Sequence, residues 1–394
     1  MWKNESGAGL FPGWDCLFLA NCMVSCPALS GGDKHFIEVA RRWRSNGLSL
    51  SVMTTDIGKR NCLLEGFDGP FVLLPGERVD NLGIMPAYAA RMVLALFKMP
   101  WRKENTLLYG TSDFLPDVLP AFLGRVFGRG RRWVQCVFHL VPHPRERGGS
   151  GVVNTVSYVM QRLSLALIRR RADLVIVDNS TLRSELVSMG FSPDKILVTV
   201  MGADRPVVRE MRPATYDGCF LGRLHVSKGV FELVDIWKRV CERRPGSSLA
   251  MVGADPLRLR GELEKKIRAL GLEGAIHILG YLPGAELEEV LSSSRVFVFP
   301  SHEEGFGISL LEAMKHGVPA VAFGLPHYRE IFGDAIITVE MGDVERFADE
   351  VGALLEDEER CQRMAVAGRT VAGRYSWERT ADLEAEAICA ILPN

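Results

Sequence analysis

Residues 296–323 read VFVFPSHEEGFGISLLEAMKHGVPAVAF, and this stretch decides the predicted fold. Its opening run, residues 296–299, is apolar and rich in β-branched and aromatic side chains, which is typical of a buried parallel strand. A loop with two glycines follows, and the pattern then predicts a helix over about 308–316 and a second buried strand at 318–323. Such a unit indicates an open α/β sheet, and these sheets bind ligands at the carboxyl edge of their strands.

Glu304 and Glu312 lie on either side of the Gly-Phe-Gly sequence in this stretch. A carboxylate can accept hydrogen bonds from both hydroxyls of a vicinal diol, as in a ribose or a hexose. Gly305 and Gly307 leave their backbone N–H groups open to a ligand, and a helix N-terminus attracts anionic groups. An isolated pair with this spacing is usually a helix-capping Glu304 and a solvated Glu312. Because the pair brackets a glycine loop between two buried strands, we favour a ligand site.

A second glycine-bounded loop, GRLHVSKG, occupies residues 222–229. It connects a strand predicted at 216–221 to a helix predicted at 230–243. Arg223 and Lys228 are five residues apart in this loop. A planar guanidinium and a compact ammonium at this spacing can hold a diphosphate between them. Surface Arg and Lys are common, so the loop alone is weak evidence.

The two loops together resemble the donor-site signature of retaining glycosyltransferases of family four, which have the GT-B architecture. The resemblance implies an α/β fold of two Rossmann-like domains facing across a cleft, with a C-terminal helix that crosses back to the first domain. We expect an acceptor-side domain at 1–203, a nucleotide-sugar donor domain at 204–374 and the returning helix at 375–394. The resemblance is strong after residue 216 and loose before residue 133. Met201 departs from it, because the family commonly has asparagine there.

The resemblance also implies roles for individual residues. The expected catalytic residues are His139, Glu304, Arg223 and Lys228, with His143 as the fallback histidine. His139 would follow a strand predicted at 134–138. The residues expected to bind the donor are Gly31, Gly32, Arg223, Lys228, Tyr281, Leu282, Glu304, Gly305, Phe306, Gly307, Ile308 and Glu312.

Several of these assignments have plain alternatives. Gly31 and Gly32 precede a helix predicted over about 34–45, and a tight turn explains a bare glycine pair equally well. Tyr281 and Leu282, which the family would place beside the nucleobase, also fit a simple turn after a strand. A histidine at a strand end, such as His139, is usually a loop or core residue.

Composition narrows the class of protein. A chain of 394 residues with 47% apolar residues suits two domains, each with its own core. There is no apolar run of 18 residues and no signal-peptide pattern at the N-terminus. The nine cysteines show neither a paired framework nor zinc-ligand spacing, which favours a reducing cytoplasm. The sequence has no Asp-x-Asp pair, so we expect no metal and no cofactor beyond the nucleotide sugar as co-substrate.

Charge is divided unevenly along the chain. Residues 1–210 carry 26 Lys and Arg against 19 Asp and Glu, and residues 211–394 carry 21 against 29. In the first half, residues 85–103 and 124–133 interleave aromatic side chains with cations, including Arg129, Arg131 and Arg132. Such segments suit an anionic membrane surface, although core packing with a solvated cationic face explains them equally well.

The function predicted from these features is retaining transfer of a sugar from a nucleotide-diphosphate sugar to an acceptor hydroxyl. The acceptor would be a glycan or a lipid-linked molecule of bacterial-type cell-surface polysaccharide or glycolipid synthesis, and no nucleic acid is expected as a partner. The expected location is cytoplasmic, with peripheral attachment to the inner face of the membrane as a further expectation. The alternatives are a nucleotide-sugar epimerase or hydrolase of the same architecture, or a non-catalytic protein that binds sugar nucleotides.

Overall fold

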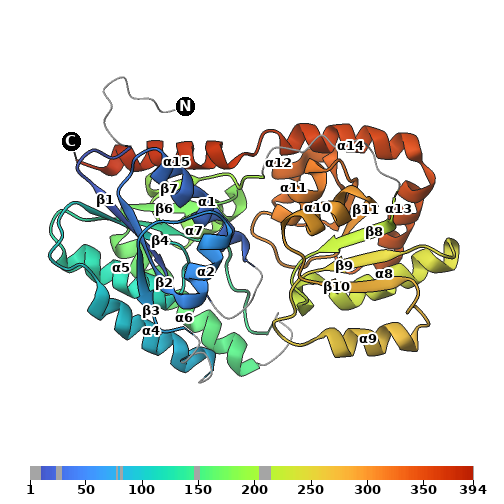
Figure 1. The fold of residues 1–394 in the computed structure, drawn as a ribbon, viewed down its shortest axis with the longest axis horizontal. Helices are drawn as coiled ribbons and strands as arrows, with labels where there is room; N and C mark the ends of the chain where they lie inside the picture. Colours follow the sequence, from blue (N-terminus) through green and yellow to red (C-terminus); the bar gives the residue numbers. More distant parts are fainter. Residues whose placement is uncertain are drawn as a thin grey trace. The chain divides into compact units, whose positions relative to one another are not determined.

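A computed structural model describes residues 10–23, 29–76, 79, 83–145, 151–203 and 214–393. The chain forms two compact units (Figure 1). The first contains the N-terminal strand, Leu29–Met201 and the C-terminal segment Trp377–Asn394, and the second contains Gly202–Ser376. Each unit is an α/β sheet with its own helices, and these two parallel sheets confirm the predicted fold class.

The sheet of the first unit has seven strands in the order β3-β2-β1-β4-β5-β6-β7. Every neighbouring pair is parallel. A parallel sheet needs helices on both faces, which explains why its strands are apolar along most of their length. The strands are β1 (Asp15–Ala20), β2 (Leu50–Thr55), β3 (Phe71–Leu74), β4 (Thr106–Gly110), β5 (Arg132–Cys136), β6 (Leu174–Val177) and β7 (Ile196–Val198).

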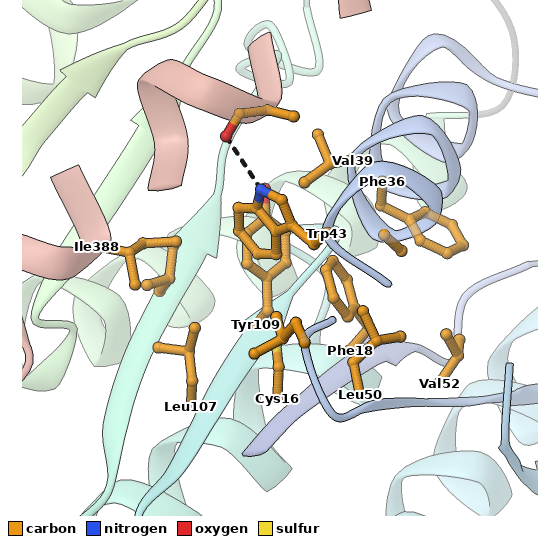
Figure 2. Packing of buried hydrophobic residues seen from close by; sticks show 14 of the residues in the cluster. Cys16, Phe18, Phe36, Val39, Trp43, Leu50, Val52, Leu107, Tyr109 and Ile388 are labelled. Atoms are coloured by element: carbon orange, nitrogen blue, oxygen red, sulfur yellow. Dashed lines mark hydrogen bonds between the residues drawn. The ribbon is translucent and has the colours of Figure 1, made fainter. Parts of the chain in front are cut away.

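Two cores form on the two faces of this sheet. One core receives side chains from α1 (Gly31–Ser45), α2 (Asp56–Leu64) and α15 (Trp377–Ile391). Figure 2 shows Trp43 at its centre, where the indole Nε1 donates to the carbonyl of Ala381 on α15 at 3.0 Å. The other core is built from four helices, which are α4 (Ile84–Lys98), α5 (Leu115–Phe127), α6 (Gly151–Arg171) and α7 (Ser180–Ser188).

The sheet of the second unit has six parallel strands in the order β10-β9-β8-β11-β12-β13. Its strands are β8 (Tyr216–Leu221), β9 (Leu249–Val252), β10 (Ile276–Gly280), β11 (Ser294–Phe299), β12 (Ala320–Phe323) and β13 (Ile337–Val339). Its α-helices are α8 (Val230–Arg243), α9 (Arg260–Ala269), α10 (Gly284–Ser292), α11 (Ile308–Lys315), α12 (Tyr328–Phe332), α13 (Val344–Glu356) and α14 (Glu358–Ala372). Its strand order is that of a dinucleotide-binding Rossmann sheet.

The structure corrects some predicted boundaries. Helix α1 begins at Gly31 rather than near residue 34, because Ser30 and Asp33 form a capping box around its first turn. Strand β5 ends at Cys136, so His139 does not directly follow a strand. The sequence analysis missed α2, α7, α10, α13, α14 and β13. No helix in the described part of the chain combines the length and apolarity needed to cross a bilayer.

Two of the arginines assigned to the basic segments are not on the surface. Arg131 is fully buried, and its guanidinium donates to the carbonyls of Lys103 and Gly124 between the ends of α4 and α5. Arg91 is also fully buried and donates to the carbonyl of Met23 at 3.3 Å. The interpretation of these two residues as surface cations is wrong, because each satisfies backbone carbonyls inside the first unit. Arg132 is half-buried and donates to the carbonyl of Ile391 at 2.8 Å.

Candidate functional site

The candidate site lies where the strand order of the second sheet reverses. β8 and β11 are neighbours, and the helices that follow them leave toward opposite ends of the sheet order. In open α/β sheets this switch point leaves a crevice at the carboxyl ends of the strands. The loop after β8 carries Arg223 and Lys228, and the loop after β11 carries Glu304. The two motifs found in the sequence therefore meet at one position of the fold.

Lys228 and Glu304 form an ion pair across the switch point. The Lys228 ammonium lies 2.5 Å from Glu304 Oε1 and donates to the carbonyl of Glu303 at 2.8 Å. The two side chains are 13% and 16% exposed, so the pair is partly shielded from water and still reachable. An ammonium has three protons, and these two bonds use two of them. No other group in the described part of the chain bonds this ammonium, so its third proton can reach an anionic ligand at the edge of the sheet.

Further bonds fix the two loops to each other. The backbone N–H of His302 donates to the carbonyl of Ser227 at 2.8 Å. Ser301 Oγ donates to Glu304 Oε1 at 3.2 Å, the same carboxylate oxygen that pairs with Lys228. Gly229 has φ +65°, and a Cβ there would lie 1.9 Å from the carbonyl oxygen of Pro300. Only glycine allows this approach, which brings Lys228 to the loop after β11.

Other residues predicted to bind the donor belong to the same two loops and to α11. Arg223 is exposed, so its guanidinium is open to a ligand. Gly307 is the N-cap of α11 with φ +95°, and Ile308 is the first residue of that helix. The Phe306 side chain is buried against Phe332 and Tyr375, with ring centroids 6.3 and 5.4 Å away. A donor contact by Phe306 would therefore use its backbone. Glu312 is half-buried on α11.

Tyr281 and Leu282 follow β10, two strands away from β8 at the same edge of the sheet. Tyr281 is 43% exposed. The N–H of Gly253 donates to the carbonyl of Gly280 at 2.8 Å and ties the end of β9 to this turn. An exposed aromatic ring on a fixed turn is suited to stacking on a planar group.

In the first unit, the structure brings Gly32 close to the segment that carries His139. A Cβ at Gly32 would lie 3.5 Å from the ring of Phe138, the neighbour of His139. The Phe138 ring also packs edge-on against His35, with centroids 4.8 Å apart. Gly31 and Gly32 lie in the first turn of α1. The N–H groups of a first helical turn have no carbonyl of the same helix to bond. The fallback His143 is exposed and packs its ring against Tyr158 at 5.6 Å.

Gln161 holds the His139 segment in place, and the sequence analysis did not identify it. Its Oε1 accepts from the N–H of Val141 at 2.8 Å, and its Nε2 donates to the carbonyl of His139 at 2.8 Å. The same Nε2 lies 2.5 Å from Asp113 Oδ2. Burial raises the pKa of Asp113 to about 6. No local motif marks this glutamine, because its partners lie about 20 and 48 residues away.

Asp117 occupies the corresponding switch point of the first sheet, between β1 and β4. Its carboxylate accepts from the N–H of Asn21 at 2.7 Å and from Ser112 Oγ at 2.6 Å. It is fully buried, and desolvation raises its pKa to about 7 despite these bonds. Its role in the structure is to join the loops after β1 and β4.

Tyr328 was also missed, and no sequence signal points to it. It is 1% exposed, and its hydroxyl has no hydrogen-bond partner within the described residues. Burial raises its pKa, and the charge of nearby Glu304 raises it further. Across the described chain, no three His, Cys, Asp or Glu side chains gather as metal ligands. The expectation of a metal-independent enzyme stays a prediction.

Comparison with known proteins shows what the domain that carries this site is similar to. Residues 215–371 match the family model described as glycosyl transferases group 1. A 106-residue segment is 36% identical to the O-antigen chain mannosyltransferase B of Escherichia coli, covering 27% of this chain and 28% of that protein. A 206-residue segment is 30% identical to the D-inositol 3-phosphate glycosyltransferase of Segniliparus rotundus, covering 48% of this chain and 46% of that protein. The matched segments thus span less than half of either relative.

A solved structure resembles nearly the whole chain. The crystal structure of Anabaena HepE in complex with UDP and glucose superposes with a TM-score of 0.74, covering 96% of this chain and 100% of that one. The two sequences are 20% identical, so the likeness shows the fold alone. Residues 215–371 include both loops of the switch point. Over these residues, the chain is similar to the glycosyl transferases group 1 family.

Proposed function

We propose that this protein is a retaining glycosyltransferase that uses a nucleoside-diphosphate sugar and an acceptor hydroxyl. The observation that carries the proposal is the Lys228–Glu304 pair at the switch point of the second sheet, beside the exposed Arg223. The two relatives are named as a mannosyltransferase and a glycosyltransferase, and the HepE crystal structure holds UDP and glucose.

The chemistry follows from charge that develops on the leaving group. When the bond between the sugar and the diphosphate breaks, negative charge grows on the departing phosphate oxygen. Arg223, the third proton of Lys228 and the first N–H groups of α11 would stabilise that charge without reorganising. Glu304 neutralises and orients Lys228 before the donor arrives. Glu312 would accept hydrogen bonds from hydroxyls of the donor.

The remaining roles are part of the same proposal. His139 would contact the donor sugar, and Tyr281 with Leu282 would lie beside the nucleobase. The acceptor would be a glycan or a lipid-linked molecule of cell-surface polysaccharide or glycolipid synthesis, as the name of the O-antigen relative suggests. We place the reaction in the cytoplasm, at the inner face of the membrane when the acceptor is lipid-linked.

The test begins with a thermal-shift screen of UDP-, GDP- and ADP-sugars, because a ligand that binds the native state raises its stability. Donors that bind are then incubated with candidate acceptors, and the product is examined by proton NMR at its anomeric centre. We expect acceptor-dependent release of the nucleoside diphosphate and an unchanged anomeric configuration. Full-rate consumption of the donor without acceptor would favour an epimerase or hydrolase. Binding without any turnover would favour a sugar-nucleotide sensor.

A further inference from the structure

The outer side of the helical layer α4, α5 and α6 is unusually apolar for a surface. α4 packs against α5 and α5 packs against α6, so the three helices form one continuous layer in the first unit (Figure 1). We call their solvent-exposed side the α4–α6 face. Phe97 on α4, Phe127 on α5 and Val152 on α6 are 81%, 72% and 75% exposed. Other large apolar residues exposed on this face are Met85, Val93, Val126, Val153, Val159 and Leu163.

On α4 these residues recur at helical spacing. Met85, Val93 and Phe97 are separated by eight and four residues, which places them along one stripe of the helix. On α6, Val152, Val159 and Leu163 recur at seven and four residues and form a second stripe. Isolated exposed apolar residues are normal, but stripes on adjacent helices mark an interaction surface.

The same face has almost no negative charge. α4 and α6 contain no Asp or Glu, and the single carboxylate of α5 is Asp117, which is fully buried. Cations instead collect where the three helices end. All three helices connect consecutive parallel strands, so they run in the same direction and their C-terminal ends lie at the same edge of the sheet. The exposed cations at or just beyond these ends are Lys98, Arg102, Arg129, Arg169, Arg170 and Arg171.

Most of this positive charge has no carboxylate partner among the described residues. No carboxylate of the described chain pairs with Arg102, Arg129, Arg170 or Arg171. Cations at helix C-terminal ends complement the helix dipole, which explains part of the pattern. The dipole does not explain why Phe97 and Phe127 lie exposed one turn away from the cations. Aromatic and aliphatic side chains interleaved with arginines match the headgroup region of a bilayer.

From these observations we propose that the α4–α6 face docks on an anionic lipid bilayer. The apolar stripes would insert between acyl chains, and Arg102, Arg129, Arg170 and Arg171 would contact lipid phosphates. Charge complementarity selects this partner over a second copy of the chain, because two such faces would bring like charges together. The inference rests on the proposed function in one respect, which is that docking would give the enzyme access to a lipid-linked acceptor.

Vesicle flotation without any sugar donor tests the proposal, so it can fail independently of the transferase assignment. We expect the full chain to float with vesicles of phosphatidylcholine and phosphatidylglycerol at low salt. It should not float with vesicles of phosphatidylcholine alone. High salt should release it from the anionic vesicles, because screening weakens the electrostatic attraction. A variant with Arg102, Arg129, Arg170 and Arg171 changed to Gln should lose binding by on the order of fivefold for each cation.

A second variant, Phe97→Ser with Phe127→Ser, removes the apolar contribution and should bind at least tenfold more weakly. Both side chains are mostly exposed, so the fold should be unaffected. A matched control combines Val366→Ser, an exposed apolar residue of α14, with Lys265→Gln and Arg268→Gln on α9. This control should float like the wild type.

Wild-type protein that does not float with anionic vesicles at low salt would overturn the proposal. Equal loss of binding in the control would overturn it as well, since binding would then not be specific to this face. Analytical ultracentrifugation tests whether the face instead contacts a second copy of the chain. A dimer that the Phe97/Phe127 variant dissociates, together with no vesicle binding, would assign the face to a second copy of the chain.

Discussion

The two sheets have the same strand order around their first strand, but different groups join the loops at their switch points. One switch point has a partly exposed ion pair, and the other has a buried carboxyl. In the second sheet, the loops after β8 and β11 are joined by the Lys228–Glu304 ion pair, which is 13–16% exposed. In the first sheet, the loops after β1 and β4 are joined by Asp117, a fully buried carboxyl with a raised pKa. One edge leaves a charged pair partly exposed, and the other uses a buried carboxyl to join two loops.

This difference indicates which residues should affect catalysis and which should affect stability. A partly exposed charged pair at a sheet edge can stabilise the charge of a bound ligand or of a transition state. A buried carboxyl with neutral hydrogen-bond donors has its pKa raised instead, and its protonation becomes linked to folding. Substitutions at the second switch point should therefore change activity, and substitutions at the first should change stability.

The largest effect is expected at the two cations that we propose bind the donor phosphates. Lys228→Ala and Arg223→Ala should each lower transfer by roughly two orders of magnitude, the scale of losing a charged contact in the transition state. The matched control is Lys265→Ala, which removes an exposed cation from α9 of the same unit. Transfer is followed as acceptor-dependent release of the nucleoside diphosphate. Near wild-type turnover in either variant would remove that residue from the site.

The next effect separates the two glutamates. Glu304→Gln should mainly lower kcat, by some tens of fold, because it releases Lys228 from the position in which it meets the leaving group. Glu312→Ala should mainly raise the KM for the donor, because a diol contact persists unchanged through the reaction. Steady-state kinetics with the donor varied distinguishes the two. If Glu312→Ala leaves KM unchanged, the diol contact lies elsewhere.

A smaller effect is expected for Gln161, a positioning residue of the first unit. Gln161→Ala removes the bonds that hold the carbonyl of His139 and the N–H of Val141. If His139 contacts the donor sugar, kcat should fall about tenfold, the scale of a mispositioned catalytic group. Donor affinity at the second switch point should not change. Gln362→Ala, an exposed glutamine on α14, is the control, and an unchanged kcat in Gln161→Ala would argue against the assigned role of His139.

A further effect, on stability rather than activity, is a pH dependence at the first switch point. Between about pH 4 and 7, Asp117 is protonated in the folded chain and ionised in the unfolded chain, because its folded-state pKa is raised to about 7. Unfolding then releases a proton, so this group's contribution to stability falls as pH rises through that window. Each pH unit of that window changes the free energy of unfolding by at most about 1.4 kcal/mol.

Urea unfolding at pH 5, 6, 7 and 8 measures this contribution in Asp117→Asn against the wild type. As pH rises, the free energy of unfolding of the variant should increase relative to that of the wild type. Asp334→Asn, which changes an exposed carboxylate, should show no such trend. A pH-independent difference for Asp117→Asn would show that its carboxyl is ionised in the folded state.

How far the sequence predicted these features depends on how local they are. The Glu304 loop and the Arg223–Lys228 loop are short, each lies between a strand and a helix, and the structure brings Lys228 and Glu304 together as one site. Lys228 and Glu304 are 76 residues apart, so their contact followed only from the topology that the resemblance implied. The roles of the individual residues stay predictions.

Other features have no local signal. Gln161 acts through partners on two distant segments, and Tyr328 reaches the neighbourhood of Glu304 from helix α12. Arg131 is part of a basic run in the sequence. In the structure it is fully buried and donates hydrogen bonds to the carbonyls of Lys103 and Gly124. A run of arginines cannot reveal which of them tertiary packing removes from the surface.

The most direct test of the transferase assignment is isothermal titration of the purified chain with the nucleoside-diphosphate sugar found in the screen. We predict one binding site per chain, with affinity reduced at least tenfold in Arg223→Ala and unchanged in Lys265→Ala. Binding of equal strength in wild type and Arg223→Ala, or no binding of any nucleoside-diphosphate sugar, would contradict the assignment of this switch point as a donor site.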